Sequence, residues 1–141
     1  MGSRRSARII ALQALYQLDI CNKTVKDVLC LDWLEKEYDK KTLDFATVLI
    51  KGVVEHLGFI DSKIVTQLEH WDLDRLSYVD RAILRFSTFS LFFQDDIPDT
   101  VVINEAIDIA KIFGTDESYK FVNGVLDGIR KEKEKLKREK D

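Results

Sequence analysis

The sequence predicts an all-α fold, and three observations favour it. Apolar residues recur at helical spacing along most of the chain, whereas the strict alternation typical of strands is nowhere sustained. One proline and six glycines are too few for the many turns of an all-β fold. A chain of 141 residues with 45% hydrophobic content can bury one sizeable core, as one domain or as two small fused subdomains.

A first helix is expected from Ser3 or Ser6 to about Asp19. Between residues 9 and 18 the only polar side chains are two glutamines one turn apart, so other helices should surround this one. Its first turn carries three arginines, Arg4, Arg5 and Arg8. Cations at a helix N-terminus oppose the macrodipole. The arginines therefore either serve an anionic ligand or form an ordinary solvated basic end.

Two further helices are expected before residue 72. Asn22 or Thr24 should cap one that runs to about Tyr38, and the next should begin at Thr42. The apolar pattern of the latter continues to residue 71, and Leu57-Gly58 indicates either a kink or a restart.

A strong helix follows Ser77, because Ser77-x-x-Asp80 fits a capping box before an apolar stripe. Arg75, Arg81 and Arg85 line one edge of this region. They could bind phosphate, but the acids that alternate with them favour a salt-bridged surface.

The clearest pattern is a helical hairpin in residues 98–130. The apolar stripe of its first helix ends at Phe113, and Gly114 suits a left-handed cap. Thr115 is the expected N-cap of the second helix, with two acids in the first turn. The expected buried positions are Val102, Ile103, Ala106, Ile107, Ile109, Ala110 and Phe113, then Val122, Val125, Leu126 and Ile129.

Gly124 and Gly128 lie one turn apart inside that second helix. A glycine there costs about 1 kcal/mol relative to alanine, so each needs a structural reason. We expect the two to form a flat patch where another backbone packs closely. The tail after Arg130 reads as a solvated helix end without an assigned task.

Charge is unevenly distributed along the chain. The formal net charge is −3, yet residues 1–18 carry +3 and residues 130–141 carry +3, which leaves the remainder at −9. Surface charges more than about 10 Å apart are largely screened at 0.1 M salt, so an acidic body does not cancel a basic end.

Chemical motifs are absent from the sequence. It has no glycine-rich phosphate loop, nucleophile elbow or zinc spacing, which argues against an enzyme and against a cofactor. His56 and His70 are too far apart to favour a metal site, and Cys21 and Cys30 are expected to be reduced, core-like residues. No signal peptide or long apolar run is visible, so we expect a cytoplasmic protein with no membrane segment.

Five segments, read together in this order, resemble the NusB family of bacterial transcription antitermination factors. The resemblance covers nearly the whole chain from Arg4 to Arg130, and its most specific parts are the last two segments. The segments are Arg4-Arg5-Ser6-Ala7-Arg8, Ala14-Leu15-Tyr16, Leu76 to Arg85, Ile103-Asn104-Glu105-Ala106 and Lys120 to Asp127.

This resemblance implies two packed antiparallel helical bundles, roughly residues 3–70 and 72–137, with about seven helices. It implies pairing with NusE, a small-subunit ribosomal protein, and binding of the boxA RNA element in ribosomal RNA operon transcripts. That complex joins NusA and NusG on RNA polymerase. Whether the free protein is a monomer or a homodimer stays open.

The resemblance also assigns roles to individual residues. It places RNA binding at Arg4, Arg5, Arg8, Lys120, Phe121 and Tyr16, and NusE binding around Asp80 and Arg81. Ser6 stands where the family often has a further arginine. Phe121 could stack on a base or belong to the core, and Tyr16 could touch RNA or reach a buried partner.

Two other hypotheses are weighed against this one. One is the helical domain found at the N-terminus of some ribosomal RNA cytosine methyltransferases, which shares the implied fold and predicts a catalytic domain downstream. The other is a bare protein-interaction module in which the N-terminal arginines have no ligand.

Overall fold

The structure is a computed structural model that describes residues 3–69 and 72–140. Within these ranges it contains seven α-helices, one short 3₁₀ helix and no strand, which confirms the all-α prediction. None of the described helices combines the length and apolar character needed to cross a lipid bilayer. The helices are α1 (Ser3–Ile20), α2 (Val25–Leu29), α3 (Lys40–Glu55), α4 (Leu57–Val65), η1 (Leu73–Arg75), α5 (Tyr78–Phe93), α6 (Asp99–Phe113) and α7 (Ser118–Lys140).

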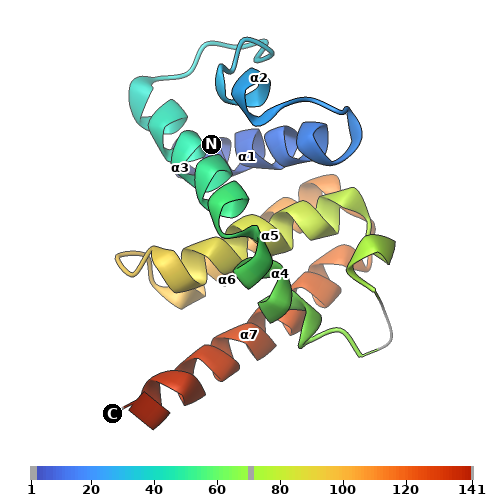
Figure 1. The fold of residues 1–141 in the computed structure, drawn as a ribbon, viewed down its shortest axis with the longest axis vertical. Coiled ribbons are helices and arrows are strands. Elements are labelled where there is room, and N and C mark those ends of the chain that lie inside the picture. The colour runs from blue at the N-terminus through green and yellow to red at the C-terminus, as the bar shows by residue number, and fades with distance from the viewer. Residues whose placement is uncertain (1–2, 70–71, 141) are drawn as a thin grey trace.

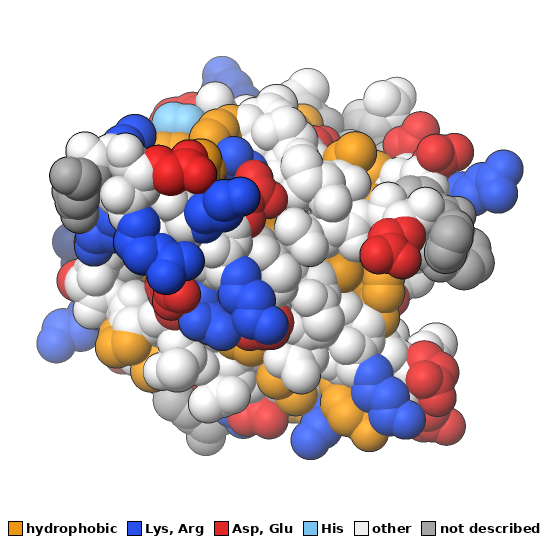
Figure 2. Space-filling view, turned by 90° about the horizontal axis from the view of Figure 1, so that it is seen from below, with side chains coloured by type: hydrophobic (Ala, Val, Ile, Leu, Met, Phe, Trp, Pro, Cys, Tyr) orange, Lys and Arg blue, Asp and Glu red, His pale blue; other side chains and the backbone are white. Residues whose placement is uncertain are grey.

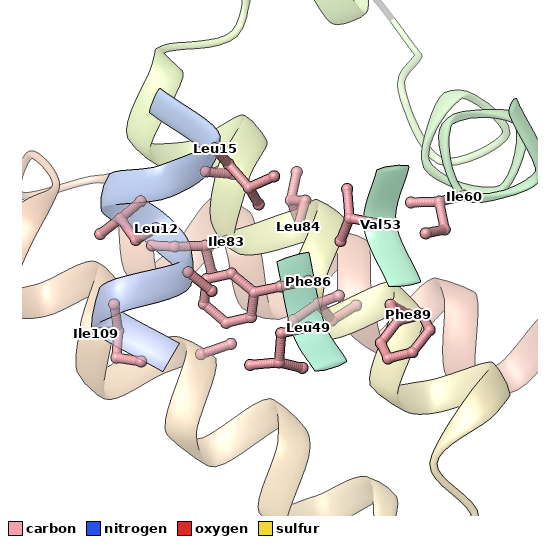
Figure 3. Packing of buried hydrophobic residues seen from close by; sticks show 14 of the residues in the cluster. Leu12, Leu15, Leu49, Val53, Ile60, Ile83, Leu84, Phe86, Phe89 and Ile109 are labelled. Carbon is pink, nitrogen blue, oxygen red and sulfur yellow. The ribbon is translucent and has the colours of Figure 1, made fainter. Parts of the chain in front are cut away.

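Helix α5 is the centre of the molecule. It packs against α1, α3, α4, α6 and α7, and Figure 1 shows it crossing the middle of the fold between the N-terminal helices above and α7 below. Phe86 and Ile83 of α5 meet Leu12 of α1 and Leu49 of α3 in the core (Figure 3). One hydrophobic cluster therefore includes residues from both halves of the chain. A division into subdomains near residue 71 stays a prediction.

The first helix is buried on one face but is not surrounded by other helices as its composition predicted, because Tyr16 and Ile20 are exposed on its open side. Ala7, Ile10, Ala11 and Ala14 are completely buried where α1 packs between α3 and α5. Small side chains on this face let the neighbouring helices approach closely, and the longer Leu12 and Leu15 fill the core.

The second helix is shorter than predicted. Thr24 caps α2 as expected, because its Oγ1 accepts a hydrogen bond from the Asp27 N–H at 3.1 Å. The helix nevertheless ends at Leu29 and not near Tyr38. Leu31 adopts a left-handed backbone conformation with φ of 60°, which breaks the helical path and starts an irregular segment up to Asp39.

Helix α3 begins two residues earlier than predicted, because Asp39 and not a later residue is its N-cap. The alternatives at Leu57-Gly58 are resolved as a restart. The chain leaves helical geometry at His56, with φ of −117° and ψ of 23°, and α4 begins at the next residue. The expected continuation to Trp71 reaches Val65, and Trp71 itself lies outside the described residues.

Ser77 caps α5 as predicted, since its Oγ accepts a hydrogen bond from the Asp80 N–H at 3.1 Å, but in the described residues the reciprocal bond of a capping box, from Ser77 N–H to the Asp80 side chain, is not formed. The details of the α6–α7 hairpin differ from the predictions. Phe113 is exposed instead of buried, and Gly114 has φ of −94°, so it is not a left-handed cap. Helix α7 begins at Ser118 and not after Thr115, because the Ser118 N–H binds the Thr115 carbonyl three residues back and forms a tighter turn first.

The prediction of a flat glycine patch on α7 is wrong. A Cβ at Gly124 would meet nothing within 4 Å, and one at Gly128 would meet the side chain of Gln67, not another backbone. Cys21 and Cys30 are free, but both are exposed, so the expectation of core-like cysteines is also wrong.

Candidate nucleic-acid interface

The three N-terminal arginines of α1 have different environments. Arg4 is exposed, and its guanidinium lies 5.0 Å from the centre of the Phe45 ring. Arg8, one turn later, lies 5.4 Å from the same ring but is only 3% exposed. In the described residues no ion pair involves Arg4, so it is the one arginine of the three that presents an uncompensated charge at the surface.

Arg5 points toward α6, where two carboxylates hold it. Its Nε and Nη2 donate to the two oxygens of Glu105, and Nη2 also donates to Asp108 Oδ2 at 2.7 Å. The hydrogen bond to Glu105 is the main cause that raises the pKa of Arg5. Arg5 remains about one quarter exposed, so a phosphate could reach it only in competition with these acids.

Arg8 is a buried charge with one weak partner. Its Nη1 lies 3.5 Å from Glu105 Oε1, and its Nη2 is buried without a hydrogen-bond partner among the residues that the structure describes. Burial lowers the pKa of Arg8, against the attraction of Glu105 and with the repulsion of Arg4 and Arg5. Arg8 is therefore buried beneath the exposed arginines and does not present its guanidinium to a ligand.

A row of cations connects this end of α1 with the start of α7. Asp108 holds Arg5, and Lys111 stands one turn further along α6. Lys111 and Lys120 both lie over the ring of Tyr119, at 5.0 and 5.9 Å. We call Arg4, Arg5, Lys111 and Lys120 the cationic row. Sequence reasoning found three of its members and missed Lys111, which looked like an ordinary solvated residue of α6.

An aromatic groove lies beside α1, along residues 6–17. Its volume is about 770 Å³. Tyr16 is 44% exposed in it and meets Tyr78 edge to face, with ring centres 6.0 Å apart and planes at 87°. The sequence singled out Tyr16 but missed the other rings. The groove is lined by Ser6, Ile9, Leu12, Gln13, Tyr16 and Gln17 of α1, by Trp33, Leu34, Glu35, Lys36 and Tyr38, and by Tyr78, Val79 and Phe113.

Phe121 has a mixed environment. It is half-buried and packs against the main core, and it also lines a smaller hollow of about 230 Å³ beside Asp80 and Ser118. Part of its ring therefore serves the core, and an edge remains at the surface.

The residues predicted for partner binding lie at the start of α5, next to this hollow. Asp80 is half-buried, and its Oδ1 is buried with no hydrogen-bond partner in residues 3–69 and 72–140. Arg81 is only 8% exposed and donates to Asp19 and to the Leu73 carbonyl, both at 3.2 Å. Arg81 is thus fixed inside the protein, whereas Asp80 lies at the edge of a hollow.

The arginines along the edge of α5 form salt bridges as predicted. Arg81 and Arg85, however, pair with acids of other helices and not with the acids near them in the sequence. Arg85 donates two parallel hydrogen bonds of 2.9 Å to Asp61 of α4, and it also contacts Asp19 of α1 at 3.2 Å. Arg75 alone keeps a neighbouring partner, Asp72, at 3.9 Å. The network joins α1, α4 and α5.

No group of three potential metal ligands occurs in residues 3–69 and 72–140. His56 stacks on Phe93 with ring centres 4.2 Å apart, and His70 lies outside the described residues. Figure 2, which views the molecule from below, shows a face on which Lys and Arg side chains gather among carboxylates.

A helical body that carries a cationic row and an aromatic groove on its surface has the features of a nucleic-acid-binding protein. Comparison with known proteins narrows this class. A family model described as the NusB family matches residues 5–131. The transcription antitermination protein NusB of Treponema pallidum (strain Nichols) is 50% identical over 130 residues, which are 91% of this chain and 92% of that protein.

Two solved structures show the same fold. A NusB structure from T. maritima has a TM-score of 0.84 and 44% identity, covering 95% of this chain and 96% of that one. A chain in a crystal structure of the antitermination factors NusB and NusE in complex with double-stranded RNA has a TM-score of 0.79 and 31% identity, covering 93% and 98%. The chain belongs to the NusB family.

Proposed function

We propose that this protein is a transcription antitermination factor that binds boxA-type single-stranded RNA together with NusE. The relatives that it matches over nearly their whole length are named transcription antitermination proteins. One similar structure contains NusE and double-stranded RNA. A factor of this kind acts in the cytoplasm, on ribosomal RNA operon transcripts, within a complex of RNA polymerase, NusA and NusG.

The observation that carries the RNA-binding proposal is the cationic row. Arg4, Lys111 and Lys120 are exposed, and within the described residues none of the three takes part in an ion pair. Three such charges give a log–log salt slope near −2 for a single strand, which is weak binding. Arg5 would add to RNA affinity when a phosphate displaces Glu105 and Asp108 from its guanidinium. Arg8 would act indirectly, because its buried guanidinium contacts Glu105, which in turn positions Arg5.

Weak phosphate contacts explain why a protein partner is needed. Sequence choice on single-stranded RNA comes from base contacts, which cations alone do not supply. We propose that NusE binds around the start of α5 and enlarges the surface. Because Arg81 is held inside the protein, Asp80 and the exposed residues beside it would make that contact, and Phe121 would offer its exposed edge nearby.

Filter binding of a boxA-containing RNA, with and without NusE and across salt concentrations, tests this function. We expect NusE to increase affinity, and Arg4→Ala with Lys120→Ala to weaken binding and flatten the salt slope by about 1.4. Lys23→Ala is the matched control, since Lys23 is exposed beyond the opposite end of α1. An unchanged slope in the double variant would contradict the cationic row as the RNA site.

Sedimentation at two concentrations would determine whether the free protein is a monomer or a homodimer.

A further inference from the structure

The C-terminal end of α7 continues as a helix beyond the packed body of the protein. Among the described residues, the last ion pairs from α7 to another element are those of Glu132 with Lys63 and of Lys133 with Asp99. Residues 134–140 are all exposed, yet they remain helical. Figure 1 shows this end of α7 at the lower left, and the view from below in Figure 2 shows Lys and Arg side chains gathered on that side. The helix therefore has about two turns that serve no core.

This end of the helix is cationic, and its charges are not used inside the protein. Residues 135–140 carry four cations and one acid, namely Lys135, Lys137, Arg138 and Lys140 against Glu139. Within the described residues none of the four cations takes part in an ion pair. The macrodipole favours cations at a helix C-terminus by about 0.3–1 kcal/mol each, which helps these turns to stay helical. That interaction leaves the charged groups available to an anion.

One face of α7 aligns this end with the cationic row. Lys120, Lys131 and Arg138 are 11 and 7 residues apart. At 3.6 residues per turn these steps are about 20° more than three turns and about 20° less than two turns, so the three side chains leave the same side of the helix. Lys135 adjoins this side, one turn after Lys131. All four are exposed, and about 27 Å of helix axis separates the first from the last.

The middle of this face does not block a ligand. Gly124, one turn after Lys120, has no side chain, and a Cβ there would meet nothing within 4 Å. Asp127 follows, and two cations already neutralise its carboxylate, Arg130 at 2.7 Å and Lys131 at 3.0 Å. A polyanion can therefore lie along α7 from one cationic end to the other without meeting an uncompensated acid at Asp127.

We propose that this face of α7 binds the phosphates of the RNA nucleotides that flank the boxA element. We call it the α7 track and define it by Lys120, Lys131, Lys135 and Arg138. The inference rests on the proposed RNA-binding function and adds a second segment to its surface. The last two residues of the track lie beyond residues 5–131, which the family model matches.

The alignment with Lys120 favours RNA over an acidic protein surface as the occupant. A strand whose phosphates lie on the cationic row can continue along the same helix face, where the potential stays positive at both ends. Phosphate contacts position a strand without reading its sequence. The α7 track would therefore hold flanking RNA of any base composition.

Filter binding with RNAs of two lengths, for the full chain with and without NusE, tests the proposal. One RNA contains the boxA element alone, and two others extend it by about eight uridines on the 5′ or the 3′ side, which is enough to span the track. For the wild type, one of the extensions should raise affinity at 0.1 M salt by about 5-fold for one added phosphate contact or about 25-fold for two. Lys135→Ala with Arg138→Ala should remove this increase and leave binding of the short RNA unchanged.

Two matched variants are the controls. Lys23→Ala with Lys26→Ala removes the same charge from exposed residues around the start of α2 and should keep the increase. Lys135→Arg with Arg138→Lys keeps the charge of the track and should also keep it. The salt slope on the extended RNA should fall by about 1.4 only in the variant that lacks Lys135 and Arg138.

The proposal is overturned if neither extension raises wild-type affinity, or if the variant without Lys135 and Arg138 keeps the increase. An equal loss of short and extended RNA also overturns it, because the end of α7 would then not act on the flanking nucleotides. If that variant weakens NusE binding in the absence of RNA, the surface is a protein contact and the proposal fails. In each case the RNA function stands as long as Arg4→Ala with Lys120→Ala still weakens binding of the short RNA. Absence of any RNA binding by the wild type overturns both.

Discussion

The guanidinium of Arg5, in the first turn of α1, is held by the carboxylate of Glu105 in the middle of α6, through hydrogen bonds from Nε and Nη2. Glu105 also lies 3.5 Å from the buried Arg8. One carboxylate therefore organises two of the three N-terminal arginines from one hundred residues away. Asp108 adds a second negative charge on Arg5, so the arginine end attracts phosphate less strongly than its sequence indicates.

Asp108→Asn should strengthen RNA binding at low salt. The Asp108 carboxylate is about half-exposed and competes with phosphate for Arg5. Removal of its charge should steepen the salt slope by up to about 0.7, the value for one additional phosphate contact on a single strand. Filter binding across salt measures this change. Asp95→Asn, which makes the same charge change in the exposed α5–α6 loop, should leave the slope as it is.

Glu105→Gln should destabilise the fold by about 1–3 kcal/mol, because the buried guanidinium of Arg8 loses the one carboxylate that pairs with it in the described part of the chain. Denaturant unfolding measures the free energy. The same substitution in an Arg8→Met background should cost less, since no buried charge is then left without a partner. Equal costs in the two backgrounds would show that the Glu105–Arg8 contact contributes nothing.

Gly52→Ala should also destabilise the protein, by about 1–3 kcal/mol. A Cβ at residue 52 would lie 2.2 Å from the ring of Phe89, where α3 crosses the buried face of α5. Gly124→Ala is the matched control on α7, where a Cβ meets open space. It should stabilise the helix by about 0.5–1 kcal/mol, so the two substitutions are expected to have opposite signs in thermal unfolding.

Asp39→Ala should lower the thermal midpoint more at pH 7 than at acidic pH. The Asp39 carboxylate accepts the Thr42 N–H at 2.9 Å, and hydrogen bonds from Thr42 lower the pKa of Asp39. A lowered folded pKa means that the cap stabilises the protein above the unfolded value of about 3.9. The part of this stabilisation that depends on the charge is lost as the pH falls through the folded pKa.

The control for this prediction is Asp39→Asn, because asparagine is an equally good cap and does not titrate. Its thermal midpoint at pH 7 should remain near that of the wild type. A difference between Asp39→Ala and the wild type that persists unchanged to pH 2 would contradict the role of the ionised carboxylate.

The local sequence is sufficient to predict that the chain is helical and which chemical groups its surface carries. The Ser77 cap and the all-α class follow from hydrogen bonds and periodicity within a few neighbouring residues, which the local sequence contains. The same holds for the cations at Arg4 and Lys120, since their identity needs no tertiary information. The sequence pattern failed at Leu31 and Phe113, where a left-handed turn and an exposed helix end override the local period.

Which of these residues can act at the surface depends on how the helices pack. Arg4, Arg5 and Arg8 look alike in the sequence, but helix packing leaves the first exposed, ties the second to Glu105 and buries the third. The aromatic groove likewise combines rings from α1, the segment after α2, α5 and α6. The physical reason is that burial and ion pairing depend on contacts between residues far apart in the chain, and these exist only once the helices have packed around α5.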